Sequence, residues 1–120
     1  AYYYYDLTDV VPDYFYLATK RTDSRINDDN IKQVFIPNDL FELGKTQIEV
    51  ENIKINIYDE ERMLVELIRK KNIIPFDYYK EIITNYRKKV DKLDIYKIQK
   101  YISYYKNEAS LYDSLMREVF

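Results

Sequence analysis

The sequence predicts an α+β fold, in which a small, mainly antiparallel sheet in the N-terminal half is followed by about four helices. Apolar and polar residues alternate with a period of two between residues 47 and 57, and from residue 59 onward the apolar residues recur at helical spacing. Strands and helices are thus grouped rather than interleaved, which is typical of α+β proteins. A chain of 120 residues can build one core but hardly two, so we expect residues 1–120 to form a single domain.

The first thirty residues contain one predicted strand between two irregular segments. Residues 1–7 resemble the last turns of a helix whose beginning is missing, and Pro12-Asp13 indicates a turn. Residues 14–19 are aromatic and β-favouring with few polar positions, which is typical of a central strand. Residues 20–30 are charged or amide-bearing almost throughout and predict a surface loop.

Three more strands are expected before the helices begin. Residues 31–36 form the second strand, which Pro37 ends. Residues 47–51 and 53–57 form the third and fourth strands, in which isoleucines alternate with polar residues. The connection between these two strands is short, so we expect them to form a hairpin.

Four helices account for the second half. The first spans residues 60–71 and begins after Asp59, which can cap it, and Tyr58 is placed to contact Met63 across that cap. Asp77 and Asp94 are the expected caps of the second and third helices, and the fourth spans about residues 108–120. The predicted apolar stripes are Met63, Leu64, Leu67 and Ile68; Tyr78, Ile82, Tyr86 and Val90; Ile95, Ile98, Ile102 and Tyr105; and Leu111, Leu115 and Val119.

The composition excludes most catalytic chemistry. The chain has no His and no Cys, which removes imidazole and thiolate catalysis and ordinary zinc sites. Its single glycine, Gly44, cannot form a phosphate-binding loop that needs several glycines. We therefore expect a protein that is not an enzyme and that needs no cofactor and no metal. The absence of cysteines and of any long apolar stretch leads us to expect a cytoplasmic protein without membrane contact.

Carboxylates are the remaining candidates for chemistry. Asp28-Asp29 and Asp59-Glu60-Glu61 could hold Mg²⁺ through oxygen ligands, as in a small nucleotidyl- or phosphotransferase. Loop solvation explains the first pair better, because no third ligand follows at a suitable spacing, and helix capping with dipole complementation explains the second group better. The sequence leaves this alternative open.

Positive charge is concentrated in the second half. Residues 1–60 carry 6 Lys and Arg against 12 Asp and Glu, a net of −6, whereas residues 61–120 carry 13 against 9, a net of +4. Two clusters stand out, Arg69-Lys70-Lys71 and Arg87-Lys88-Lys89 with Lys92, and tyrosines are interspersed at positions 79, 86, 96, 101 and 104. Basic residues with aromatics suit nucleic-acid binding, but solvated helix faces with tyrosines packed in the core give the same pattern.

Arg62 has two interpretations. It lies four residues before Glu66, so the two side chains can form an ion pair on the helix surface. Alternatively, Arg62 is held out for a phosphate or an acidic partner. The candidate interaction surface therefore comprises Glu61, Arg62, Glu66, Arg69, Lys70, Lys71, Arg87, Lys88, Lys89 and Lys92.

Several segments, in their order along the chain, resemble the AbiEi-type antitoxins of bacterial abortive-infection systems. Tyr4-Tyr5-Asp6-Leu7-Thr8-Asp9 resembles an "hG-L-T-D" signature, with Asp6 where glycine is usual. Residues 38–44 resemble an "ELG" segment and residues 55–67 an "hYD-x-ER-T-hh-D-L" helix start, in which Glu61 and Arg62 match. Met63 replaces the usual Thr and Glu66 the usual Asp, while residues 68–72 and 79–89 fit the following helices.

This resemblance implies a C-terminal antitoxin domain whose N-terminal winged helix-turn-helix, absent from this chain, binds operator DNA and represses the operon. The toxin that it counteracts resembles nucleotidyltransferases, and the pair is of type IV, in which the antitoxin need not contact the toxin directly. The domain is also expected to be able to form a homo-oligomer. An alternative to the antitoxin is therefore a plain oligomerisation module of a transcription factor.

Overall fold

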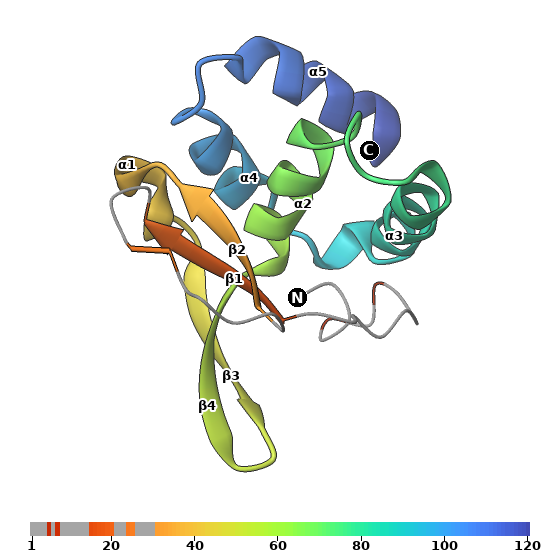
Figure 1. Ribbon diagram of the computed structural model, residues 1–120. Helices are drawn as coiled ribbons and strands as arrows, with labels where there is room; N and C mark the ends of the chain where they lie inside the picture. The colour runs from red at the N-terminus through yellow and green to blue at the C-terminus, as the bar shows by residue number, and fades with distance from the viewer. Residues whose placement is uncertain (1–4, 6, 8–14, 21–23, 26–30) are drawn as a thin grey trace.

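The computed structural model describes residues 5, 7, 15–20, 24–25 and 31–120, and its elements follow the order predicted for an α+β protein (Figure 1). Two strands, β1 (Phe15–Lys20) and β2 (Ile31–Ile36), precede a short helix, α1 (Asn38–Phe41). A hairpin follows, formed by β3 (Lys45–Val50) and β4 (Ile53–Tyr58). The helical half comprises α2 (Glu60–Arg69), α3 (Phe76–Lys88), the 3₁₀ helix η2 (Val90–Lys92), α4 (Ile95–Ile102) and α5 (Glu108–Glu118).

The strands form two separate sheets rather than one mainly antiparallel sheet. β3 and β4 pair antiparallel as predicted, with Ile48 opposite Ile55, and Glu51 and Asn52 turn the chain with positive φ values of 51° and 66°. Two consecutive positive φ values match the right-handed twist of the strands that they join. β1 and β2, in contrast, are parallel. The nearly unbroken run of non-polar residues in β1, which predicted a central strand, is equally typical of a parallel one.

Helix α2 lies at the centre of the helical half, with α3, α4 and α5 around it (Figure 1). Seven of its ten residues are buried, and it packs against both α4 and α5. The core that surrounds it contains members of the three other predicted stripes, Ile82 and Tyr86, Ile98 and Ile102, and Leu111 and Leu115. Leu7, Ile36 and Leu40 from the first half complete this core, so one core joins both halves of the described chain.

The helix boundaries confirm two of the three expected caps. Asp59 accepts a hydrogen bond from the Arg62 amide, and Asp94 accepts from the amides of Tyr96 and Lys97. The prediction that Asp77 caps the second helix was wrong, because α3 begins at Phe76 after Pro75 and no side chain caps it. Proline fixes φ near the helical value and has no N–H, so Pro75 lets the helix begin two residues earlier than a cap at Asp77 would. Asp77 instead lies in the first turn, where its charge still favours the helix dipole.

Several sequence predictions differ from the structure in extent. Helix α1 was not predicted, since four residues are too few for an apolar period to show. Lys20 ends β1 instead of opening a loop, and Tyr105 is buried although it lies beyond the end of α4. Most of the predicted opening helix, the turn at Pro12-Asp13 and most of the loop at residues 20–30 lie outside the described residues.

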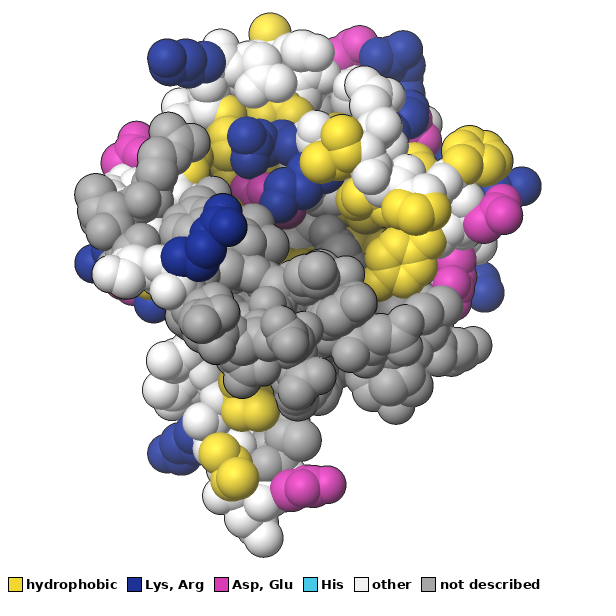
Figure 2. Space-filling view, in the orientation of Figure 1, with side chains coloured by type: hydrophobic (Ala, Val, Ile, Leu, Met, Phe, Trp, Pro, Cys, Tyr) yellow, Lys and Arg dark blue, Asp and Glu magenta, His cyan; other side chains and the backbone are white. Residues whose placement is uncertain are grey.

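The β3–β4 hairpin projects away from the helices (Figure 1). The register places Ile48, Ile53, Ile55 and Ile57 on one face, opposite the face of Gln47, Asn56 and the charged residues. Gln47 donates to Asn56 across the strands, at 3.1 Å. The side chain of Ile53 is 65% exposed and that of Ile55 is 36% exposed, and Figure 2 shows hydrophobic side chains on the surface of this projection.

Candidate functional site

Arg62 is the largest fully buried side chain of the described chain, with an exposed fraction of 0%. Its Nη1 donates to the carbonyl oxygens of Leu40 and Leu43, each at 2.7 Å. Its Nε and Nη2 donate to Oε1 of Glu66 at 3.3 and 3.2 Å, and its guanidinium lies 4.6 Å from the centre of the Tyr58 ring. The predicted pairing of Arg62 with Glu66 is therefore confirmed, but the pair is buried and does not lie on the helix surface; the alternative, in which Arg62 extends toward a partner, is wrong.

Glu66 is the anion at the centre of this buried cluster. Its Oε1 accepts from the Tyr105 hydroxyl at 2.6 Å, and Nη1 of Arg69 lies 3.2 Å from Oε1 and 3.1 Å from Oε2. Burial acts to raise the pKa of Glu66, but the Tyr105 hydrogen bond and the positive charges of Arg62, Arg69 and Lys70 outweigh it and hold the pKa below its usual value. Glu66 is therefore ionised at neutral pH, and it ties α2 to the chain that follows α4.

Gly44 makes the close approach to Arg62 possible. Its φ is +78°, a conformation that glycine adopts without strain, and a Cβ at this position would lie 2.7 Å from Cβ of Arg62. The Asp59 amide donates to the Gly44 carbonyl at 2.8 Å, which extends the β3–β4 ladder by one pair. The two segments at residues 38–44 and 55–67, which the resemblance treated as separate motifs, thus meet in a single contact.

Glu61 is also buried, but its environment is the opposite of that of Glu66. Desolvation raises the pKa of the Glu61 carboxyl, and the negative charge of Asp59 raises it further, while Lys97 has a weaker opposing effect. Asp59 itself accepts from the Tyr101 hydroxyl at 2.5 Å in addition to capping α2. Within the described residues, no group of three or more carboxylates is arranged to hold a metal ion. The other candidate carboxylates, Asp28-Asp29, lie outside the described residues.

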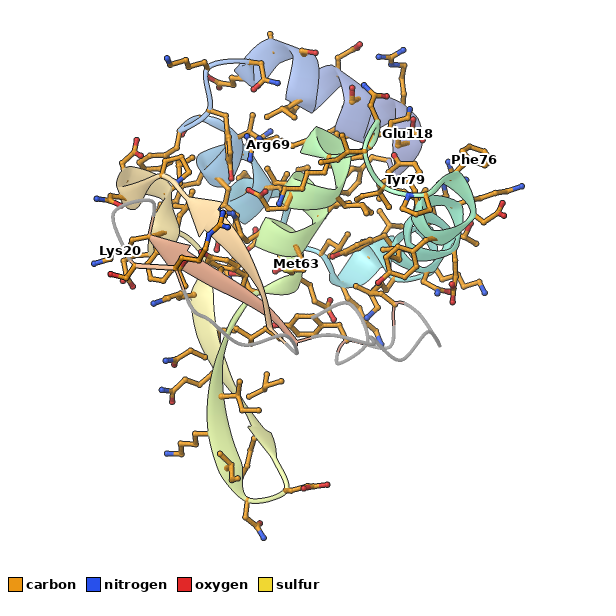
Figure 3. The ribbon with its side chains drawn as sticks, in the orientation of Figure 1. Lys20, Met63, Arg69, Phe76, Tyr79 and Glu118 are labelled. Atoms are coloured by element: carbon orange, nitrogen blue, oxygen red, sulfur yellow. The ribbon has the colours of Figure 1, made fainter. Side chains whose placement is uncertain are left out.

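The two basic clusters meet at Glu118 on α5. Lys71 pairs with Oε1 of Glu118, and Nε of Arg87 donates to the Glu118 carbonyl at 2.5 Å. Figure 3 shows Glu118 and Tyr79 on the same side of the molecule, where α5 approaches α3. Because Arg69 and Lys70 also pair with Glu66, most cations of the first cluster are already engaged by acidic residues of the same chain.

Lys89 of the second cluster is likewise engaged. Its Nζ lies 3.0 Å from Oε1 of Glu60 and donates to the Tyr5 carbonyl at 3.2 Å. Lys88 and Lys92 are exposed and form no ion pair with any described residue. On the face shown in Figure 2, Lys and Arg side chains are spread among acidic ones. Of the candidate basic surface, these two lysines are the cations most available to an outside partner.

The tyrosines divide between core and surface. Tyr79, Tyr86 and Tyr101 are buried, and Tyr86 donates to the Glu60 carbonyl at 2.9 Å. Tyr96 and Tyr104 are exposed, Tyr96 by 80%. Core packing therefore explains three of the five tyrosines considered for nucleic-acid stacking, and the other two remain accessible.

An open pocket of about 440 Å³ lies between α4 and α5, lined by Gln99, Ile102, Lys106, Glu108, Ala109 and Tyr112. It contains none of the residues of the candidate interaction surface. No helix among the described residues is long and apolar enough to cross a membrane.

The sequence did not indicate the roles of Asn85, Tyr105 and Glu118. Their hydrogen-bond partners lie 31 to 78 residues away, so no local pattern marks them.

The chain was compared with known proteins at the level of sequence. No protein-family model matches it, and no curated protein does.

Proposed function

We propose that this chain is the C-terminal domain of an AbiEi-type antitoxin, a non-catalytic domain of a cytoplasmic bacterial abortive-infection system. In this proposal it counteracts a nucleotidyltransferase-like toxin and assists repression of its own operon. Operator DNA is bound mainly by a winged helix-turn-helix that precedes the domain in the full-length protein.

The contact between Gly44 and Arg62 is the observation that carries the proposal. The resemblance rests on an "ELG" segment and a "YD-x-ER" helix start, whose glycine and arginine lie 18 residues apart. In this chain the glycine of the first lies against the arginine of the second, and the arginine donates to the Leu43 carbonyl at 2.7 Å. A fold that needs both residues at one contact gives a physical reason for the two motifs to occur together.

The buried cluster has a structural role in this proposal. Arg62 and Glu66 satisfy each other and two backbone carbonyls, so neither side chain is available to a substrate. The surface that remains for partners includes Lys88 and Lys92 together with the exposed Tyr96 and Tyr104.

A growth assay tests the proposal directly. The full-length gene is co-expressed with the neighbouring toxin gene, and we expect growth to be restored. Lys88→Ala/Lys92→Ala should weaken the rescue while leaving the folded protein intact, whereas Lys80→Ala on the same helix as Lys88 should not. If the full-length protein does not restore growth, the antitoxin assignment is wrong.

The projecting hairpin favours a second candidate, an oligomerisation module of a transcription factor. Two-stranded hairpins have little stability of their own in water, and the isoleucine face of this one is uncovered at Ile53 and Ile55. Light scattering of this chain over a dilution series tests the idea. A dimer that Ile53→Lys dissociates, and that Lys54→Ala on the opposite face does not, would support it; a monomer at every concentration would exclude it.

A further inference from the structure

The segment around residues 5–7 is held against the helical body by contacts with residues far along the chain. Leu7 has an exposed fraction of 0% and belongs to the core. Nδ2 of Asn85 on α3 donates to the Leu7 carbonyl at 2.8 Å, across 78 residues. The apolar side chain and the backbone of Leu7 are therefore both fixed by the body.

Tyr5 is fixed in the same manner, two residues earlier. Lys89 donates to the Tyr5 carbonyl at 3.2 Å, and the Tyr5 hydroxyl donates to the Tyr58 carbonyl at 2.6 Å, at the end of β4. Lys89 also pairs with Glu60 at 3.0 Å, so its charge is compensated in the first turn of α2. One lysine thus connects α2, the end of α3 and the N-terminal segment.

The spacing of the two donors at α3 matches the segment that they hold. Asn85 lies in the last turn of α3, and Lys89 follows four residues later, directly after the end of the helix, so the two lie about one helical turn apart. They donate to the carbonyls of residues 7 and 5, which are separated by one residue. Both acceptors are backbone carbonyl oxygens. We refer to Asn85 and Lys89 as the clamp.

We propose that the clamp fixes the point at which the chain enters this domain, beside the C-terminal end of α3, by holding Tyr5 and Leu7 there. The inference rests on the proposed function for its biological meaning: in an antitoxin, the preceding part is the operator-binding domain. The clamp then limits how far the DNA-binding domain can lie from the body that carries antitoxin activity.

The first experiment measures release of the segment in the chain itself. Since the chain contains no cysteine, Leu7→Cys introduces a single thiol whose labelling rate reports its accessibility. We expect Asn85→Ala/Lys89→Ala to raise the labelling rate by about tenfold or more, because local opening of the segment then costs less free energy. Lys80→Ala/Thr84→Ala, which removes an exposed pair at the same spacing on α3, should leave the rate unchanged. Equal rates in the two double variants would overturn the proposal.

Leu7→Cys could itself loosen the segment. Hydrogen exchange of the N-terminal peptide, measured with Leu7 retained, is therefore the second readout. Faster exchange is expected in Asn85→Ala/Lys89→Ala and not in Lys80→Ala/Thr84→Ala, and identical exchange in both would again overturn the clamp. Circular dichroism spectra of all variants establish that the body remains folded during these measurements.

The second experiment uses the full-length protein. Small-angle scattering should show a larger radius of gyration for Asn85→Ala/Lys89→Ala than for the wild type, because release of residues 5 and 7 lengthens the connection between the two parts. An unchanged radius, with the segment shown to be released by labelling, would overturn the inference about the entry point. A full-length protein that binds no operator DNA would refute the proposed function instead, and the labelling experiment does not depend on that result.

Discussion

Replacement of Arg62 by alanine tests whether the buried guanidinium holds α2 to the turn at residues 40–44. The substitution removes the donor from the carbonyls of Leu40 and Leu43, and it removes one of the cations around Glu66. Breaking a buried ion pair by deleting one partner costs about 3–5 kcal/mol, and a buried carbonyl left without a donor costs about 1–3 kcal/mol. Arg69 still compensates Glu66, so the terms do not add in full, and we expect a loss of about 4–6 kcal/mol.

Such a loss is a large part of the total stability of a domain of this size. Domains are typically stable by about 5–15 kcal/mol, so Arg62→Ala should lower Tm by roughly 15–25 °C or leave the chain partly unfolded. Urea denaturation followed by circular dichroism measures the effect. Arg69→Ala is the matched control, because Arg69 contacts the same carboxylate from a partly exposed position and should cost only about 1 kcal/mol.

Two results would refute this reasoning. The first is a loss for Arg62→Ala within about 1 kcal/mol of that for Arg69→Ala, which would place the guanidinium in a solvated environment. The second concerns Arg62→Met/Glu66→Leu, in which both charges are replaced by apolar groups of similar size. This double variant should be more stable than Arg62→Ala, because it no longer contains a buried carboxylate whose charge is only partly compensated. A double variant that is less stable would show that the ion pair itself, and not the unpaired charge, determines the cost.

Three further predictions follow from the same region and from the buried tyrosines. Gly44→Ala should lower the free energy of unfolding by about 1–3 kcal/mol in urea denaturation, because alanine is strained at a φ of +78° and its Cβ would meet Arg62; unchanged stability would mean that α2 can shift away. Glu61→Gln should leave stability at pH 7 unchanged or higher, whereas Glu66→Gln should lower it, because burial raises the pKa of Glu61 while the pKa of Glu66 is held below its usual value. As the pH falls, protonation of Glu61 therefore adds stability, and the contribution of Glu66 is lost only as the pH passes below about 4.5; urea midpoints of the two variants at several pH values check both signs. Burial raises the pKa of Tyr5 and of Tyr79 from 10.0 to about 12, so their contribution to stability is complete below pH 10 and should be lost between about pH 10 and pH 12, as tyrosinate absorbance and circular dichroism followed together can verify.

The elements that the sequence predicted well are those with a local cause. Asp59 capped α2 as expected because the cap bonds to an amide only three residues away. The hairpin was predicted because alternation along each strand and a two-residue turn are both visible within fourteen residues. The parallel pairing of β1 with β2 was not predicted, because a run of apolar residues in a strand does not indicate whether its partner runs parallel or antiparallel.

The candidate site shows the same division. Local spacing correctly paired Arg62 with Glu66 but placed the pair on the surface. Its burial depends on Leu40 and Leu43, which lie 22 and 19 residues before Arg62, and on Tyr105, which lies 39 residues after Glu66. The basic clusters were likewise identified as charges, whereas their neutralisation by Glu118 and Glu60 depends on how α5 and α2 pack.

The sequence alone therefore determined the α+β class, the helical second half, the caps at Asp59 and Asp94, and the lack of imidazole and thiol groups. These follow from residue types and from hydrogen bonds within one helical turn or one hairpin. Only the tertiary structure decided that Arg62 is buried and connects α2 to the turn at residues 40–44, and that Gly44 must lack a side chain. It also decided that Asn85 and Lys89 hold residues 5 and 7. Burial and charge compensation are set by groups distant in the chain, and no local spacing records which of those groups will meet.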